Sequence, residues 1–192
     1  MDSALGSVET DATVAAPNTT AINGGAVRTI GAQTYNDNVT LGANTTLTST
    51  TTGAITFNGT LDGAAADTQT LDVNTAGTTS FNGVVGGTDA LARLTTDLNG
   101  AGITVIDAMT VNANVVEIND PLEVAQNLTA NATTSATFDN TVDSSAGELN
   151  DLTVNSPLTT FNDVVGGTDS LGTLTTDPAG TTTINTPTVN TV

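Results

Sequence analysis

Two segments of the chain, residues 81–97 and 161–177, carry almost the same sequence eighty residues apart. The first reads FNGVVGGTDALARLTTD and the second FNDVVGGTDSLGTLTTD, so only four positions differ. Neighbouring segments repeat with a similar spacing, since AITFNGTLD matches ATFDNTVD and TYNDNVTL matches EINDPLEV. An internal period is the sequence signature of repeat architectures. The unit of about 80 to 85 residues therefore limits the possible folds more than any other feature.

A shorter pattern lies inside this unit: a large apolar residue, then Asn or Asp, then a short turn. Its copies begin at Ile22, Tyr35, Phe57, Phe81, Ile106, Ile118, Phe138, Phe161 and Ile184. Most successive copies lie 20 to 25 residues apart, but two spacings, Ile22 to Tyr35 and Ile106 to Ile118, are about half as long. Because the short spacings occupy the same place in both units, we interpret them as part of the architecture.

The segments around each copy predict short strands joined by tight corners. Alternating stretches such as Thr45–Thr48 and Leu71–Val73 are typical of half-buried strands. Asn-Gly, Asn-Asp and Gly-Gly pairs suit the corners, because these residues tolerate left-handed backbone angles. A unit of about 22 residues cannot bury its apolar face alone, and stacking on a neighbour continues one apolar column.

These features predict an all-β fold, a parallel β-helix or solenoid of about eight or nine coils. Residues 1–192 would form one continuous segment, made of a partial unit 1–18, a unit 19–102 and a unit 103–192. At roughly 4.8 Å per coil the rod would be on the order of 40 Å long. The alternative is a pair of tandem immunoglobulin-like β-sandwiches, which the period also fits. The chain lacks the buried Trp and the tyrosine corner that are expected of such sandwiches.

Two sets of side chains are predicted to stack along the coils. We expect an interior core stack of the four phenylalanines, Phe57, Phe81, Phe138 and Phe161. The polar residue after each would lie at a corner, where stacked amides can hydrogen-bond along the column. These corner residues are Asn58, Asn82, Asp139 and Asn162.

The charge and the missing residue types exclude several functions. The net charge is −18, with 20 acids against Arg28 and Arg93, so phosphates could not be neutralised and no nucleic-acid partner is expected. Cys and His are absent, which removes thiolate chemistry, disulfides, zinc sites and a His general base. No apolar run approaches the roughly 18 residues of a membrane span, so no membrane insertion is expected.

The sequence bears on three kinds of site. Catalysis is not expected, because the carboxylates recur with the repeat whereas a catalytic pair is normally unique. No cofactor is expected, although calcium remains possible: Asp89, Asp97, Asp169 and Asp177 are the metal candidates, with turn capping as their alternative role. Ice binding by Thr-rich strands is a further idea, but the Thr-rich stretches do not recur in every coil.

The motifs GAQTYNDNVTLGANTTLTS, ITFNGTLDG, LDVNTAGTTSFNGVVGG and LTTDPAGTTTIN resemble the repeats of giant bacterial surface adhesins, the filamentous-haemagglutinin-like and autotransporter-type proteins. The similarity spans nearly the whole chain. It implies a right-handed parallel β-helix that is secreted or lies on the bacterial cell surface and serves as a stalk or fibre. Such repeats carry no catalytic residues to transfer. We expect any signal peptide and secretion domain to lie outside these residues.

The expected function is structural: a stiff stalk or fibre for adhesion or for scaffolding at a cell surface or matrix. The last residues, TTTINTPTVNTV, resemble TTAINGGAVRTI near the start, which suggests a segment of a longer array or segments that join end to end. The expected partners are therefore copies of the same protein or neighbouring repeats. The alternative is a module that binds a glycan or a cell-surface protein through one exposed β face, for which Met109–Val124 is the stretch to inspect.

Overall fold

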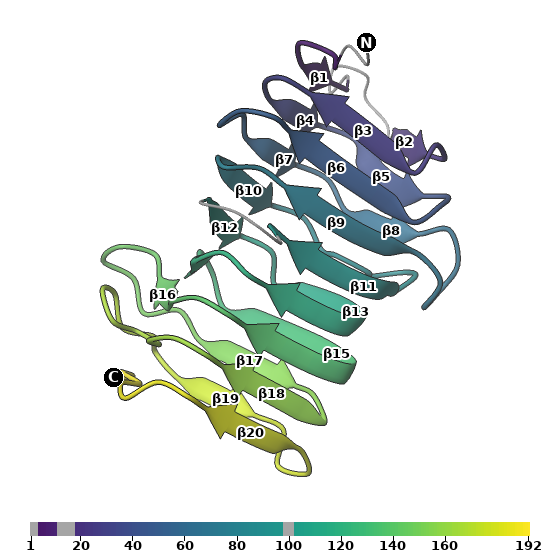
Figure 1. Ribbon diagram of the computed structural model, residues 1–192. Helices are drawn as coiled ribbons and strands as arrows, with labels where there is room; N and C mark the ends of the chain where they lie inside the picture. The colour runs from purple at the N-terminus through teal and green to yellow at the C-terminus, as the bar shows by residue number, and fades with distance from the viewer. Residues whose placement is uncertain (1–3, 11–17, 98–101) are drawn as a thin grey trace.

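The computed structural model describes residues 4–10, 18–97 and 102–192 and forms a parallel β-solenoid of about eight turns. In that part of the chain every strand pair is parallel and no helix is present. The coils stack along one axis, with the two ends of the chain at opposite ends of the stack (Figure 1). The predicted all-β parallel β-helix is confirmed, and the tandem sandwiches are excluded because their sheets would be antiparallel.

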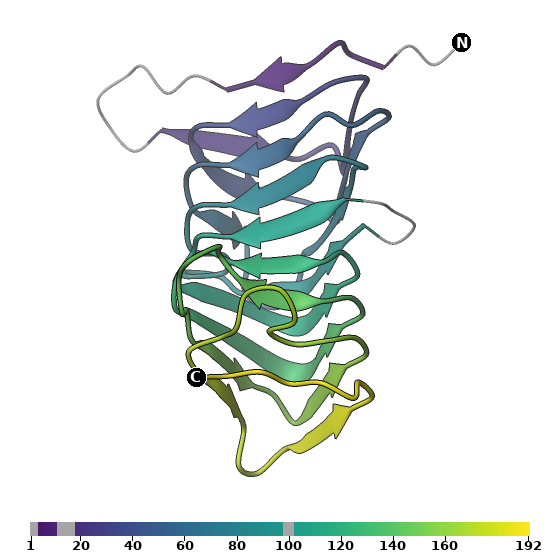
Figure 2. The ribbon, with the colours of Figure 1, turned by 90° about the vertical axis from the view of Figure 1, so that its left-hand side faces the viewer.

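Each coil passes over three faces in turn. The first face is a seven-stranded sheet. Its strands are β1 (Val8–Glu9), β4 (Gln33–Tyr35), β7 (Ile55–Phe57), β10 (Thr78–Phe81), β12 (Ile103–Ile106), β14 (Leu122–Val124) and β16 (Val142–Ser144). Figure 2 shows the regular stacking of the coils from one side.

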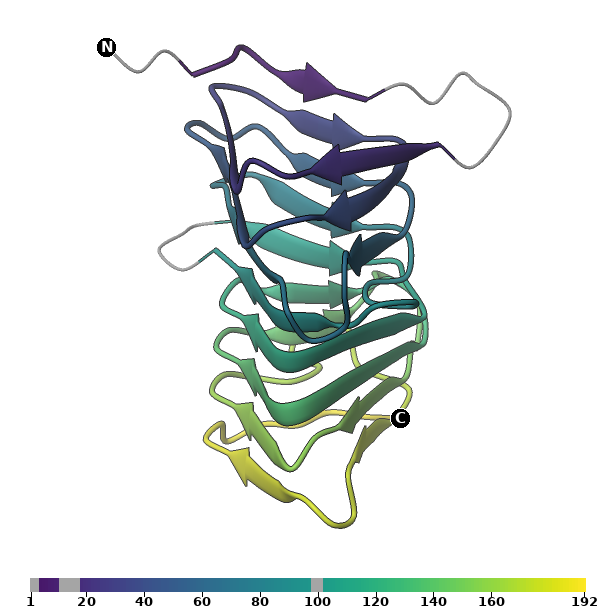
Figure 3. The ribbon, with the colours of Figure 1, turned by 90° about the vertical axis from the view of Figure 1, so that its right-hand side faces the viewer.

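The second and third faces meet at a corner that two long strands cross. The second face contains β2 (Thr19–Ile22), β5 (Asn38–Leu41), β8 (Leu61–Gly63), β17 (Leu152–Asn155) and β19 (Leu174–Thr176). The third face contains β3 (Ala26–Thr29), β6 (Thr45–Ser49), β9 (Thr70–Asn74), β11 (Leu91–Thr96), β18 (Leu158–Phe161) and β20 (Thr181–Ile184). Two long strands, β13 (Thr110–Ile118) and β15 (Leu128–Phe138), bend across the corner and belong to both faces; Figure 3 shows them as V shapes.

Columns of inward-pointing residues run along the faces, and two of them can be followed over the length of the solenoid. On the first face, successive ladder partners are Val8, Gln33, Ile55, Thr79, Thr104, Leu122, Val142, Val165 and Val189. On the third face they are Val27, Leu47, Val73, Thr96, Ile118, Phe138, Phe161 and Ile184. Nearly all of these side chains are buried between the faces, so the core is continuous from coil to coil.

The phenylalanines lie in two stacks on different faces, not in one. Tyr35, Phe57 and Phe81 stack on the first face with ring centroids 5.1 and 5.2 Å apart. Phe138 and Phe161 stack on the third face at 4.9 Å. Offset stacking of this kind stabilises a core beyond the burial of apolar area.

The separation of the stacks follows from the two short spacings in the sequence. A full spacing of 20 to 25 residues returns the chain to the same face one coil later, as from Phe57 to Phe81. A short spacing carries it over two faces only, so the pattern moves from the second face at Ile22 to the first at Tyr35. It moves again from the first face at Ile106 to the third at Ile118.

The sequence unit therefore spans three full coils and about two-thirds of another. Consequently each unit presents the same residues one face back from the preceding unit, a net rotation of roughly 120° against the direction in which the chain winds. Three equivalent segments illustrate this: β2, β12 and β20 begin the same motif and lie on the second, first and third faces respectively. Sequence comparison alone gives the period but not this phase.

Candidate functional site

Amide ladders cover two corners of the solenoid. Asn58 Nδ2 donates to Asn36 Oδ1, and Asn82 Nδ2 donates to Asn58 Oδ1, each at 2.7 Å. In the second unit a similar ladder, shifted by one coil, joins Asp139, Asn162 and Asn185, with distances of 2.6 and 2.7 Å. A third ladder, on the second face, joins Asn112, Asn131 and Asn155 at 2.8 Å per step. All four predicted corner residues thus take part in hydrogen bonds along the axis, which hold successive coils in register.

An acidic corner occurs twice with the same geometry. Asp62 Oδ1 accepts hydrogen bonds from the backbone N–H groups of Thr88 and Asp89 at 2.8 and 3.4 Å. Asp143 Oδ1 accepts the equivalent bonds from Thr168 and Asp169 at 2.9 and 3.3 Å. The carboxylate that caps the Gly-Gly-Thr-Asp corner therefore comes from the preceding coil.

The metal candidates are not brought together. Asp89 and Asp169 lie at equivalent corners on different faces. The Asp177 carboxylate accepts the Ala179 N–H at 2.8 Å, a local turn cap. Asp97 is buried at the end of β11 with a positive φ of 35°. Within the described ranges, no group of three or more His, Cys, Asp or Glu side chains could hold a metal ion.

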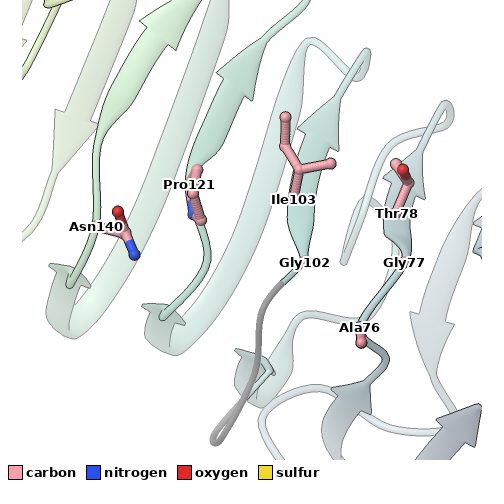
Figure 4. Close-up of a pocket in the computed structure, with 7 residues that line it drawn as sticks. All are labelled: Ala76, Gly77, Thr78, Gly102, Ile103, Pro121 and Asn140. Atoms are coloured by element: carbon pink, nitrogen blue, oxygen red, sulfur yellow. The ribbon is translucent and has the colours of Figure 1, made fainter. Parts of the chain in front are cut away.

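A shallow open groove runs along the corner where the third face meets the first. Its lining residues are Ala76, Gly77, Thr78, Gly102, Ile103, Pro121 and Asn140, at the starts of successive strands (Figure 4). The glycines are required by the close stacking, because a Cβ on Gly77 would lie 2.4 Å from the Thr52 carbonyl oxygen. None of the lining side chains is a general acid, a general base or a charged ligand.

A second kind of groove lies beside the acidic corner and, like that corner, occurs twice. One copy lies beside Asp62 and Asp89, and the other beside Asp143 and Asp169. The copies lie on the second and first faces, as the rotation of the unit requires. Repeated surface features therefore point in different directions around the axis, which disfavours a recognition surface confined to one face.

Asp120 is a buried carboxyl that the sequence pattern did not single out. It is 2% exposed, and its Oδ2 accepts the Thr104 hydroxyl at 3.0 Å while its Oδ1 has no hydrogen-bond partner. Burial raises the pKa of Asp120 to about 6; the hydrogen bond from Thr104 opposes the rise and the charge of Asp97 adds to it. The equivalent pair, Thr20 and Asp37, makes the same 3.0 Å bond but lies nearer the surface.

A buried polar network lies near the start of the first face. The Tyr35 hydroxyl donates to Gln33 Oε1 at 2.9 Å, and Gln33 Nε2 donates to the Thr48 carbonyl oxygen at 3.0 Å. Burial raises the pKa of Tyr35, so the hydroxyl remains a donor. These bonds tie the first face to the third across the interior, which is a structural role.

Arg93 and the apolar stretch Met109–Val124, which stand out in the sequence, have structural roles in the stacked coils. Arg93 forms an ion pair with Asp72 at 2.9 Å between adjacent strands of the third face. The stretch Met109–Val124 is one coil whose apolar side chains alternate into the core, with Met109 itself exposed. In the described residues, no helix has the length and apolar character to cross a membrane.

Comparison of the chain with family models, with curated proteins and with solved structures found no match.

Proposed function

We propose that the chain is a structural segment of an extracellular repeat protein and forms a stiff stalk or fibre for adhesion or for scaffolding at a cell surface or matrix. The observation that carries this proposal is the set of inward columns that continue from coil to coil, together with amide ladders that each join three successive coils. A load along such a rod is shared by parallel hydrogen-bond ladders on three faces. The proposal assigns no catalytic role and no cofactor to the chain.

The surface chemistry supports the extracellular part of this proposal. The chain has no cysteine to oxidise and carries a net charge of −18, which keeps an extended particle soluble and disfavours contact with nucleic acid. The motifs that resemble bacterial adhesin repeats point the same way. We therefore include secretion and display on a bacterial cell surface in the proposal.

Immunogold electron microscopy of source cells, with antibody raised against the purified chain, tests the location. The proposal predicts gold on fibres or stalks outside the cell envelope, removed when surface protein is shaved by protease. Label confined to the cell interior would overturn it. Pre-immune serum from the same animal is the control.

A second candidate function is recognition of a glycan or a cell-surface protein, and the duplicated groove beside the acidic corner is the observation that favours it. Two equivalent grooves predict two sites of similar affinity on one chain. Glycan-array screening followed by calorimetry tests this. A stoichiometry of two per chain, reduced to one by Asp62→Ala, would support it, and no binding on the array would count against it.

A further inference from the structure

The C-terminal end of the solenoid is a core surface without a cover. Ile184 is 49% exposed, whereas Ile106, at the same position of the motif one unit earlier, is 2% exposed. Val189 is 39% exposed, and its counterpart Val111 is 1% exposed. The residue types are the same, so the difference arises because a further coil covers the inner segment and none covers the last.

The C-terminal coil is also poor in charge. Residues 178–192 contain no acidic or basic side chain, whereas the N-terminal segment that carries Val8 also carries Glu9. A C-terminal end without charged side chains can meet this acidic segment without the like-charge repulsion that two sides of the solenoid would experience, and a depletion of charge is typical of interface centres.

The two ends of the first face are complementary. Its inward column begins at Val8 and ends at Val189, and both valines lack a ladder partner on their outer side within the described residues. The strands at both ends run in the same sense around the axis. Stacking the C-terminal end of one copy on the N-terminal end of the next therefore forms parallel pairs like those inside the chain, whereas joining two C-terminal ends would require antiparallel pairs.

We infer that the C-terminal end is a docking surface for the N-terminal coil of a second copy of this chain, with Val189 of one copy stacked on Val8 of the next. The contact joins different surfaces of the two copies and does not close, so it produces linear filaments and not dimers. Because the solenoid is the stalk of the proposed function, this inference rests on that proposal and specifies the partner and the register.

Cysteine cross-linking tests the register, because the chain has no native cysteine. Ser7 and Thr188 immediately precede the two valines, so the inferred register brings their Cα atoms to about 4.8 Å, within the range of a disulfide. Mixing S7C protein with T188C protein under mild oxidation should give a cross-linked pair. The double variant S7C/T188C should give a ladder of covalent multimers. Val189→Asp should abolish both products, and the matched control Leu149→Asp, at an exposed mid-chain position, should abolish neither.

A pair of cysteines within one chain distinguishes an incorrect junction between copies from an incorrect stacking of coils within one copy. Thr141 and Val164 immediately precede Val142 and Val165, which are ladder partners in adjacent coils, so T141C/V164C should form a disulfide within one chain. If that bond forms and the mixed variants remain monomeric, the junction is refuted while the stacked coils remain. A T188C homodimer would overturn the inference by showing that C-terminal ends meet. Failure of the internal bond would refute the rod on which both proposals depend.

Discussion

The buried carboxyl of Asp120 makes the stability of the solenoid depend on pH. Its pKa is raised from 3.8 to about 6 in the folded chain. The folded state therefore holds this proton more tightly than the unfolded state. The contribution to stability is complete below the unfolded pKa and is lost as the pH rises through about 6.

Asp120→Asn removes this dependence. The Asn side chain keeps an oxygen that can accept the Thr104 hydroxyl, and it carries no charge to desolvate. At 1.36 kcal/mol for each pKa unit, the variant should be more stable than the parent by up to about 3 kcal/mol at pH 7.5, and by roughly half as much at pH 5.0. For a chain of this length each kcal/mol corresponds to a rise of about 2–4 °C in Tm.

Thermal unfolding followed by far-ultraviolet circular dichroism at pH 5.0 and 7.5 measures the effect. The lower pH is kept above the pI of about 4.1, where the chain would lose its net charge. Asp37→Asn is the matched control, because Asp37 makes the same bond to a threonine near the surface, and it should change Tm little at either pH. If Asp120→Asn is less stable than the parent at pH 7.5, or shifts Tm equally at both pH values, the reasoning about burial is wrong.

Substitutions at three further sites, two of them with a comparison variant, test the core and the ladders by chemical denaturation. Phe81→Ala leaves a cavity in the aromatic stack and should lower the free energy of unfolding by about 3–5 kcal/mol; an effect under 1 kcal/mol would show that the stack does not hold the coils. Gly77→Val places side-chain atoms against backbone and should destabilise by at least about 1–3 kcal/mol, whereas Gly24→Ala, which meets nothing within 4 Å, should be nearly neutral; equal effects would refute the close-packing explanation. Asn58→Ala removes two ladder bonds and should lower stability by about 1–3 kcal/mol, while Asn58→Asp should be milder because Asp139 occupies the equivalent place.

The fold could be predicted from the sequence because the repeat, the strand alternation and the corner residues agree with one another. The phase of the repeat could not, since the number of residues in a coil varies along the chain. The steps of the inward column show this, with 25 residues from Val8 to Gln33 and 18 from Thr104 to Leu122. For this reason the sequence predicted one stack of phenylalanines, whereas the structure has two.

The burial and the contacts of individual polar residues could not be predicted from the sequence either. Asp37 and Asp120 occupy the same position of the repeat and bond to equivalent threonines, yet only Asp120 is buried. The metal candidates were chosen from the acids within the repeated motif. The structure shows that Asp62 and Asp143, from the preceding coil, cap those corners instead. Contacts between coils depend on the register, which sequence spacing alone does not give.

Electron cryomicroscopy of the chain at high concentration, with calcium and then with EDTA, tests the central claim that stacked coils build a fibre. The account predicts filaments with a repeat of about 4.8 Å along the axis under both conditions. Discrete particles under both conditions would contradict the fibre. Filaments that dissolve in EDTA would contradict the account that packing and amide ladders alone hold the stack.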